Sequence, residues 1–206
     1  HHLWFLWFLC WFVCGFVLIV KLLQVMHVPA VSSRWLTSGT RYVWLIPLAA
    51  VPQSFMASGS YDYGPDTSIG LLPLPAVFAY YAIFFGYGAI CFPHKGFHEK
   101  VGRFWPVYFA LATIFFIAVL TIIENKDEGS NYELISLYSS LFAWLMIFGL
   151  IGLFRKMFSQ ENKKVRFVSD SAYWLYIAHL PLIQIIQFWV SDWPLPSFIK
   201  LMVVCI

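Results

Sequence analysis

The sequence predicts an all-α protein, a polytopic transmembrane helix bundle with six complete spans and a truncated seventh. Hydrophobic residues make up 61% of the 206 residues and charged residues only 11%, whereas soluble domains carry about 25% charged residues. Several uncharged runs are as long as the ~20 residues that a spanning helix needs. The segments between these runs alternate in charge, as the loops on the two sides of a membrane do. Together these observations predict an integral, multi-pass membrane protein.

Six uncharged runs define the predicted spans, at residues 3–20, 42–61, 71–92, 104–123, 134–154 and 171–191. The fourth and fifth runs are the strongest. The second is the weakest, because Pro47 and Pro52 are expected to kink it, and whether it fully crosses the membrane is left open. A seventh run begins near Phe198 and ends with the sequence.

Every second connecting segment is basic. Residues 21–41 hold three cations and no anion, residues 93–103 hold three cations against one carboxylate, and residues 155–167 hold five cations against one carboxylate. The segments between them carry mostly carboxylates. Because basic loops remain on the cytoplasmic side of a membrane, residue 1 is predicted to lie outside and the three basic loops inside.

Net charge and cysteine spacing argue against a nucleic-acid-binding protein and against a cysteine metal or redox site. A net charge of +3 is too small to indicate a nucleic-acid partner. The cysteines lie in apolar stretches without the C-x-x-C spacing of metal or redox sites, so no metal site is predicted and buried positions are expected for Cys10, Cys14, Cys91 and Cys205. Residues 1–206 are predicted to form a single domain. It is expected to be incomplete at the N-terminus, where the first residue is not Met, and at the C-terminus.

The sixth predicted span carries an ionisable side chain, His179. Helical spacing gathers polar side chains into one arc beside it: Ser169, Tyr173, Tyr176, Gln184, Gln187 and Ser191. His179 lies about eight residues, or ~12 Å, from the inner end of the span, and Pro181 leaves the carbonyl of Ile177 without its helical partner. Ionisable groups inside a membrane are rare and usually functional. The alternative is a histidine that bonds to a neighbouring helix, next to a proline that only kinks the span.

Two outer segments are candidate sites for a carbohydrate. Trp4, beside His2 at a cavity mouth, could stack on a sugar ring, although an interfacial aromatic belt or the remnant of a purification tag would explain the same residues. The loop at residues 61–67 places Asp62, Asp66 and Thr67 among tyrosines around a Gly-Pro turn. Carboxylate and aromatic groups suit sugar hydroxyls and ring faces, but polar outer loops are also ordinary.

One inner loop is a candidate phosphate site. Lys95, Lys100 and Arg103 are suited to bind the phosphates of a nucleotide-like donor. Positive charge is expected on this side whatever the function, so topology alone also accounts for these residues.

Four quoted segments, in this order, resemble the membrane acyltransferase-3 family: "HLWFL" at 2–6, "GPDTSIGLLPLP" at 64–75, "YYAIFFGYGAICF" at 80–92 and "SDSAYWLYIAHLPLI" at 169–183. The nearest branch is the one that modifies glucans. The resemblance implies transfer of an acyl group, with acyl-CoA as co-substrate and no permanently bound cofactor, to a hydroxyl of a glycan or similar envelope acceptor in the bacterial inner membrane. It also implies that His2 heads the family's H-x-W-x-L motif and that His179 ends its Y-x-x-Y-x-x-H motif.

The sequence departs from the family pattern at two points. No pair of glutamates follows the first motif, and no arginine here has a histidine eleven positions later, which is the family's best-regarded catalytic element. That element is expected upstream of His1, so these residues alone are expected to be inactive. His179 is then expected to position substrate or stabilise an oxyanion, with Tyr176 and Gln184 lining the passage. The alternatives are a small-solute transporter or channel, and a long-chain membrane acyltransferase of another fold.

Overall fold

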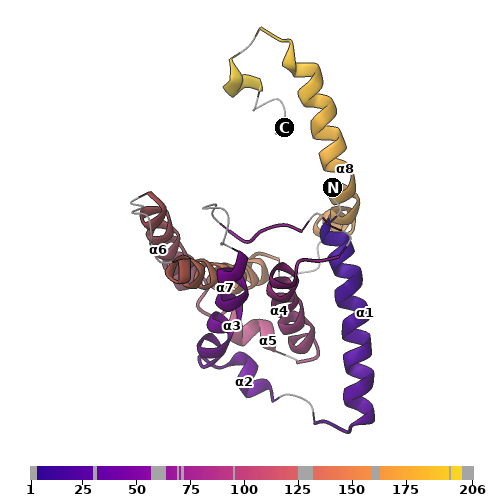
Figure 1. The fold of residues 1–206 in the computed structure, drawn as a ribbon, viewed down its shortest axis with the longest axis vertical. Coiled ribbons are helices and arrows are strands. Elements are labelled where there is room, and N and C mark those ends of the chain that lie inside the picture. Colours follow the sequence, from indigo (N-terminus) through magenta and orange to yellow (C-terminus); the bar gives the residue numbers. More distant parts are fainter. Residues whose placement is uncertain are drawn as a thin grey trace. The chain divides into compact units, whose positions relative to one another are not determined.

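The computed structural model describes residues 4–29, 32–56, 64–68, 70, 72–94, 96–124, 132–158, 163–194 and 196–200. Within these ranges every regular element is a helix (Figure 1), which confirms the predicted all-α class. Four helical segments are long and apolar enough to cross a membrane: α1 (Trp4–Val25), α6 (Trp105–Glu124), α7 (Tyr132–Met157) and the Trp174–Ser191 part of α8 (Lys163–Ser191). The shorter helix α4 (Pro75–Cys91) is also apolar. These helices confirm a multi-pass membrane protein.

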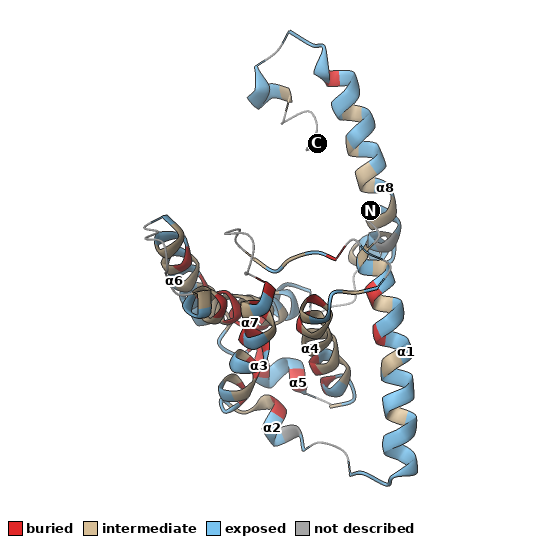
Figure 2. Ribbon diagram, viewed as in Figure 1, coloured by how far each residue is buried: buried red, intermediate tan, exposed pale blue. Residues whose placement is uncertain are grey.

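The chain forms two compact units, one of residues 3–159 and the other of residues 160–206. In the first unit α7 packs against α3 (Arg41–Met56), α5 (Phe97–Val101) and α6, and α3 also contacts α4. The short helix α2 (Ser33–Thr37) contacts α3 and α5, and α1 lies against α4. The buried residues concentrate where α3, α4 and α7 face one another (Figure 2). The prediction of one domain over residues 1–206 stays a prediction.

Aromatic side chains connect helix α1 to the rest of its unit. Phe8 and Phe12 are buried, and the Phe12 ring lies 4.9 Å from Phe78 of α4. Most of the helix beyond them is exposed, with Leu18 and Leu22 more than 60% accessible (Figure 2). Water would not tolerate so long an apolar face, but the hydrocarbon of a bilayer covers it. Cys10 and Cys14 lie on this helix and are exposed.

The cysteine prediction is therefore wrong for Cys10 and Cys14. A membrane helix turns apolar residues outward as readily as inward, because lipid is as apolar as a protein core, so an apolar run does not indicate burial. Cys91 is buried, as predicted. Cys205 lies outside the described residues.

Helix α3 runs without interruption through Pro47 and Pro52, from Arg41 to Met56. Its 16 residues are fewer than the ~20 needed to cross a bilayer, and the end of the predicted run at 42–61 lies outside the described residues. Full crossing therefore stays a prediction. Arg41 and Gln53 are both buried in this helix.

The turn between α5 and α6 approaches α7 closely at a pair of glycines. A Cβ atom on Gly152 would lie 2.6 Å from Cβ of Trp105 and closer still to the carbonyl oxygen of Gly102. A Cβ atom on Gly102 would likewise clash with the backbone of Gly152. Small residues let two backbones meet in this way, so the Gly102–Gly152 contact fixes the turn before α6 against α7.

The second unit contains α8. This helix begins at Lys163 rather than at residue 171, because lysine and arginine are good helix formers and continue the helix on the aqueous side of the apolar run. The unit's described contacts include a hydrogen bond of 2.6 Å that the Lys200 ammonium donates to the carbonyl of Ser191. Trp174 and Phe188 are more than 70% exposed, as expected of a helix face in lipid.

Candidate functional site

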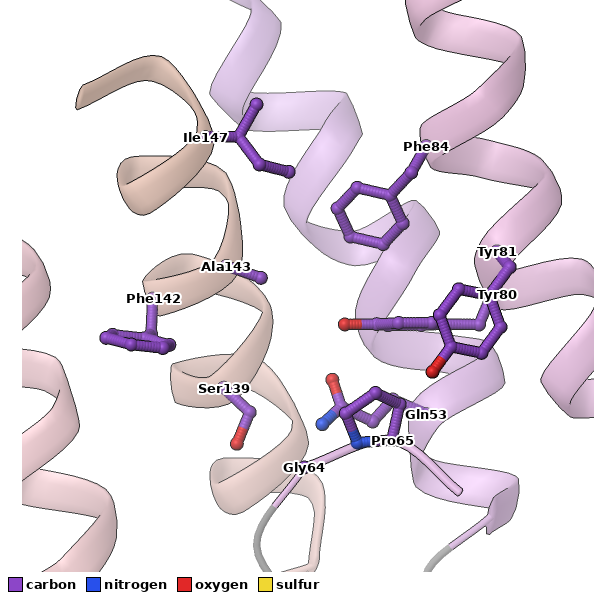
Figure 3. A pocket seen from close by; sticks show the side chains of 10 residues that line it. All are labelled: Gln53, Gly64, Pro65, Tyr80, Tyr81, Phe84, Ser139, Phe142, Ala143 and Ile147. Atoms are coloured by element: carbon purple, nitrogen blue, oxygen red, sulfur yellow. The ribbon is translucent and has the colours of Figure 1, made fainter. Parts of the chain in front are cut away.

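A cavity of about 340 Å³ lies between α3, α4 and α7 in the first unit. Ten residues line it (Figure 3): Gln53, Gly64, Pro65, Tyr80, Tyr81, Phe84, Ser139, Phe142, Ala143 and Ile147. On α4 the lining residues are Tyr80, Tyr81 and Phe84, and both tyrosines lie three or four positions before Phe84. On α7 Ser139, Ala143 and Ile147 follow one another at intervals of four, the spacing that places side chains on one helix face. Gly64 and Pro65 bring the segment that is predicted to face outside to the same cavity.

The cavity has a polar end and an apolar end. The amide of Gln53 and the hydroxyl groups of Tyr80 and Tyr81 lie toward Pro65, whereas Phe84 and Ile147 lie at the opposite end (Figure 3). Aromatic rings make up much of the wall between. The cavity is thus mostly apolar, with its hydrogen-bonding groups gathered near the segment that is predicted to face outside.

Buried polar groups of α3 and α7 support the polar end. Gln53 is only 4% exposed, and its Oε1 accepts a hydrogen bond of 2.9 Å from the Ser140 hydroxyl. The neighbouring Ser139 hydroxyl is buried and has no hydrogen-bond partner among the described residues. A buried polar group without a partner is costly, so Ser139 is a candidate contact for a polar atom of a ligand.

Aromatic packing closes the apolar end. Phe84 stacks on Trp144 with ring centroids 4.4 Å apart, and Trp144 stacks on Phe148 at 5.6 Å. Tyr87 meets both Trp144 and Phe148 edge-on. These rings fill the space between the cavity and the other end of α3, where Arg41 lies.

Arg41 is a buried cation, only 2% exposed. It donates hydrogen bonds to the carbonyl of Thr37 at 2.7 Å and to the hydroxyls of Tyr42 and Tyr108 at 3.1 and 3.2 Å. Its guanidinium carbon lies 4.5 Å from the centre of the Phe148 ring. No carboxylate within the described part of the chain forms an ion pair with it, so carbonyl, hydroxyl and aromatic groups replace a counter-ion.

Three of the residues predicted for the outer site lie in the described part of the first unit. The Trp4 ring packs 5.4 Å from Tyr81 and 5.3 Å from Phe8, and Asp66 lies close enough to Tyr81 to interact with it electrostatically. Thr67 is exposed. The structure therefore brings Trp4 and Asp66 to a tyrosine that lines the cavity. His2 and Asp62 lie outside the described residues.

The predicted phosphate site is basic at the surface. Lys100 and Arg103 are both exposed, and neither forms an ion pair with a carboxylate in the part of the chain that the structure describes. Glu99, which directly precedes Lys100, pairs instead with Arg155 of α7. A cavity of about 470 Å³ adjoins that pair, and Lys100 and Arg103 do not line it. Lys95 lies outside the described residues.

His179 is partly buried in the second unit. Its Nδ1 lies 2.6 Å from the carbonyl oxygen of Tyr176 and 3.2 Å from that of Leu175. A carbonyl only accepts, so Nδ1 carries the proton, and in the neutral ring Nε2 is then a hydrogen-bond acceptor. The Tyr176 ring lies 5.6 Å from the imidazole, and Gln184, farther along α8, is exposed. The structure thus brings Tyr176 to His179.

A comparison with protein families shows to which family the chain belongs. The model of the acyltransferase domain, Acyl_transf_3, matches residues 1–206. The chain belongs to the acyltransferase-3 family. No curated protein and no solved structure matches it. Family membership confirms the resemblance carried by the quoted motifs and implies a membrane acyltransferase, while the glucan-modifying branch stays a prediction.

The sequence interpretation missed the cavity of this acyltransferase-3 protein. Its main polar residue, Gln53, lies in a predicted span, and an uncharged amide in an apolar run is a signal of the same kind as His179. A second signal was present in α7, where Ser136, Ser139 and Ser140 share one helix face and are all buried. Which helices these faces would meet is a property of the tertiary structure.

Proposed function

We propose that this acyltransferase-3 protein is an O-acyltransferase that moves an acyl group from acyl-CoA, on the cytoplasmic side, to a hydroxyl of a glycan or similar envelope acceptor. The family match over residues 1–206 is the observation that most supports the proposal. The proposal includes six spans and part of a seventh, in a bacterial inner membrane, with residue 1 on the outer side. The alternation of basic and acidic loops supports that orientation.

The reaction sets the chemical requirements. The acceptor oxygen forms a bond to the acyl carbon, the carbon–sulfur bond of the thioester breaks, and the proton of the hydroxyl passes through a base to the departing thiolate. Such a transfer needs a base near the hydroxyl and donors for the oxyanion. We assign the base to the family's Arg/His element, which no arginine and histidine of residues 1–206 form.

His179 is proposed to orient the acceptor hydroxyl. With Nδ1–H donating to the carbonyl of Tyr176 at 2.6 Å, the neutral ring offers Nε2 as an acceptor for an O–H group. Oxyanion stabilisation, the other predicted role, would require a proton on Nε2. Tyr176 and Gln184 are proposed to line the passage beside the imidazole.

The two substrates are proposed to approach from opposite sides. Lys95, Lys100 and Arg103 would attract the phosphates of the donor, and the exposure of Lys100 and Arg103 supports this. The acceptor would approach past a set of residues predicted to face outside, and the packing of Trp4 on Tyr81 supports this. This set is His2, Trp4, Asp62, Asp66 and Thr67.

Acyl transfer from labelled acyl-CoA tests the proposal. Inverted membrane vesicles that contain the natural full-length protein should transfer label to envelope glycan, and His179→Ala should lower the rate at least about tenfold at matched protein level. His179→Gln should retain part of the rate, since an amide can still accept a hydrogen bond. Leu182→Ala, on the exposed apolar face of the same helix, is the matched control.

Two results would overturn the proposal. The first is a wild-type preparation that transfers no acyl group, above all one that instead accumulates a solute without consuming acyl-CoA, as a transporter would. The second is an unchanged transfer rate in both His179 variants, which would make His179 a structural residue and remove its assigned role.

A further inference from the structure

The cavity between α3, α4 and α7 has the polarity of a site for an amphiphile. Its polar groups, the Gln53 amide and the Tyr80 and Tyr81 hydroxyls, lie at the end near Pro65, and Phe84 and Ile147 form the apolar end (Figure 3). A volume of about 340 Å³ is near the lower limit of small-molecule sites, roughly 300 Å³. That volume suits one flexible chain better than a bulky ring system.

A sugar without a lipid chain would be a poor ligand for this mostly apolar cavity. Pyranose rings carry hydroxyls on nearly every carbon, and each would need a partner once removed from water. Beyond the polar end, the lining side chains Phe84, Phe142, Ala143 and Ile147 offer no hydrogen-bonding group. A hydrocarbon chain has no such requirement.

The positions of the polar and apolar ends distinguish the acyl chain of the donor from the hydrocarbon chain of an outer-leaflet lipid. An acyl chain delivered by a donor on the cytoplasmic side would have its polar thioester on the inner side, deep in the bundle, and its tail pointing outward. A lipid of the outer leaflet has the opposite direction, with its polar group outside and its tail toward the midplane. Gln53 and Pro65 lie at the end predicted to face outside, so the cavity matches the outer-leaflet lipid.

Buried polar atoms indicate where the polar group of that lipid would bind. Ser139 is only 5% exposed, and its hydroxyl is buried with no hydrogen-bond partner among the described residues. Gln53, equally enclosed, uses its Oε1 for Ser140, which directs the Nε2 end of the amide toward other acceptors. A hydroxyl, ether or carbonyl oxygen at the first atoms of a chain would satisfy these groups.

We propose that this cavity binds the apolar chain of an outer-leaflet amphiphile, with the oxygen at the head of the chain held at Gln53 and Ser139. The acceptor of the acyl group is therefore lipid-linked, its chain anchored in the cavity while its hydroxyl-bearing head remains at the outer surface. The identification of this amphiphile as the acceptor rests on the proposed function, whereas the binding of the chain does not.

Photolabelling with two hexadecanol probes tests the site and its direction. One probe carries a diazirine at the terminal carbon and the other carries it beside the hydroxyl, and both are added to membranes that contain the natural full-length protein. The tail probe should label residues around Phe84 and Ile147, and the head probe residues around Gln53 and Pro65. The reverse pattern would indicate a donor chain and would overturn the proposal.

Two variants connect the labelling to the cavity. Ala143→Phe, which fills the space, should reduce labelling at these residues at least about fivefold, while Ala110→Phe on the exposed face of α6 should leave it unchanged. Gln53→Leu should reduce labelling by the hexadecanol probe several-fold relative to a hexadecane probe with the same diazirine. Labelling spread along the lipid faces of α1 and α6 and insensitive to Ala143→Phe would show ordinary bilayer contact and would overturn the proposal.

The labelling experiment tests the chain-binding site, and the acyl-transfer assay tests the proposed function, so either result can be negative without the other. Membranes that show the predicted labelling but transfer no acyl group would contradict the proposed function and leave the chain site in place. Membranes that acylate a lipid-free soluble glycan as fast as a lipid-linked one would contradict the assignment of the acceptor, whatever the labelling shows.

Discussion

The Arg41 guanidinium is held by oxygen atoms of three helices, α2, α3 and α6. It bonds to the carbonyl of Thr37, at the end of α2, and to the hydroxyl of Tyr108 on α6. Because Arg41 lies on α3, one side chain joins three elements. A lysine would keep the charge, but its single ammonium lacks the planar fork that reaches several acceptors at once.

Arg41→Ala is expected to destabilise the protein by about 3 kcal/mol, since hydrogen bonds to a charged group are worth ~1.5–3 kcal/mol each and their acceptors would remain buried. Arg41→Lys should give an intermediate loss. Thermal unfolding of the purified protein in detergent measures both. Arg34→Ala, an exposed arginine of α2, is the control and should leave the midpoint unchanged. An Arg41→Ala midpoint equal to that of the control would contradict the structural role.

Contact between elements depends on two glycines, Gly102 in the turn before α6 and Gly152 in α7. Gly152→Ala is expected to lower the free energy of unfolding by about 1–3 kcal/mol, because its new Cβ would meet Trp105 Cβ at 2.6 Å and the Gly102 carbonyl. Gly88→Ala on α4 is the matched control, since no atom lies within 4 Å of its added Cβ. The control should be neutral or slightly stabilising, because alanine favours a helix by ~1 kcal/mol over glycine. Equal unfolding midpoints for the two variants would show that the helices can separate without cost.

Helix α8 carries a proline within its length, Pro181. Pro181→Ala would restore the N–H that pairs with the carbonyl of Ile177 and is expected to raise the unfolding midpoint, since proline costs ~3 kcal/mol inside a helix. It is also expected to slow acyl transfer, because the bend predicted at Pro181 and the unpaired carbonyl predicted at Ile177 would be lost. The two readouts are a thermal melt and the vesicle assay. A variant with a raised unfolding midpoint and an undiminished rate of acyl transfer would show that Pro181 has no part in activity.

The predicted elements succeed or fail for identifiable reasons. The runs at 104–123 and 134–154 match α6 and α7 closely, because long apolar segments have few alternatives in a bilayer. The short helices α2 and α5 lie in predicted loops, where five-residue helices leave no periodic signal. Helix α3 continues through Pro47 and Pro52, and the kink expected there stays a prediction.

For the whole molecule, loop charge predicts which face is cytoplasmic. With Cys10, Cys14, Cys91 and Cys205 replaced by alanine, Thr67→Cys should react with a membrane-impermeant maleimide in intact cells stripped of their outer envelope. Lys100→Cys should react only after the membrane is opened. Both positions are exposed in the structure, so accessibility to reagent depends on the side of the membrane alone.

The same pair of variants tests whether the spans between them cross. Residues 67 and 100 flank α4, so labelling of both from one side would show that α4 does not span. Labelling of Lys100→Cys in intact cells, with Thr67→Cys protected, would invert the predicted orientation and would place the cavity's polar end on the cytoplasmic side.

Composition and run length by themselves determined that this protein is helical and lies in a membrane, because a bilayer admits few structures that satisfy every backbone hydrogen bond. Ordered motifs determined its family. The tertiary structure alone decided that Gln53, Tyr81 and Ser139, which are far apart in the sequence, share one cavity. It also decided that Arg41 is buried with no carboxylate partner among the residues that the structure describes. The physical reason is that lipid and protein interior are equally apolar, so the sequence of a membrane helix shows its length but not which face meets another helix.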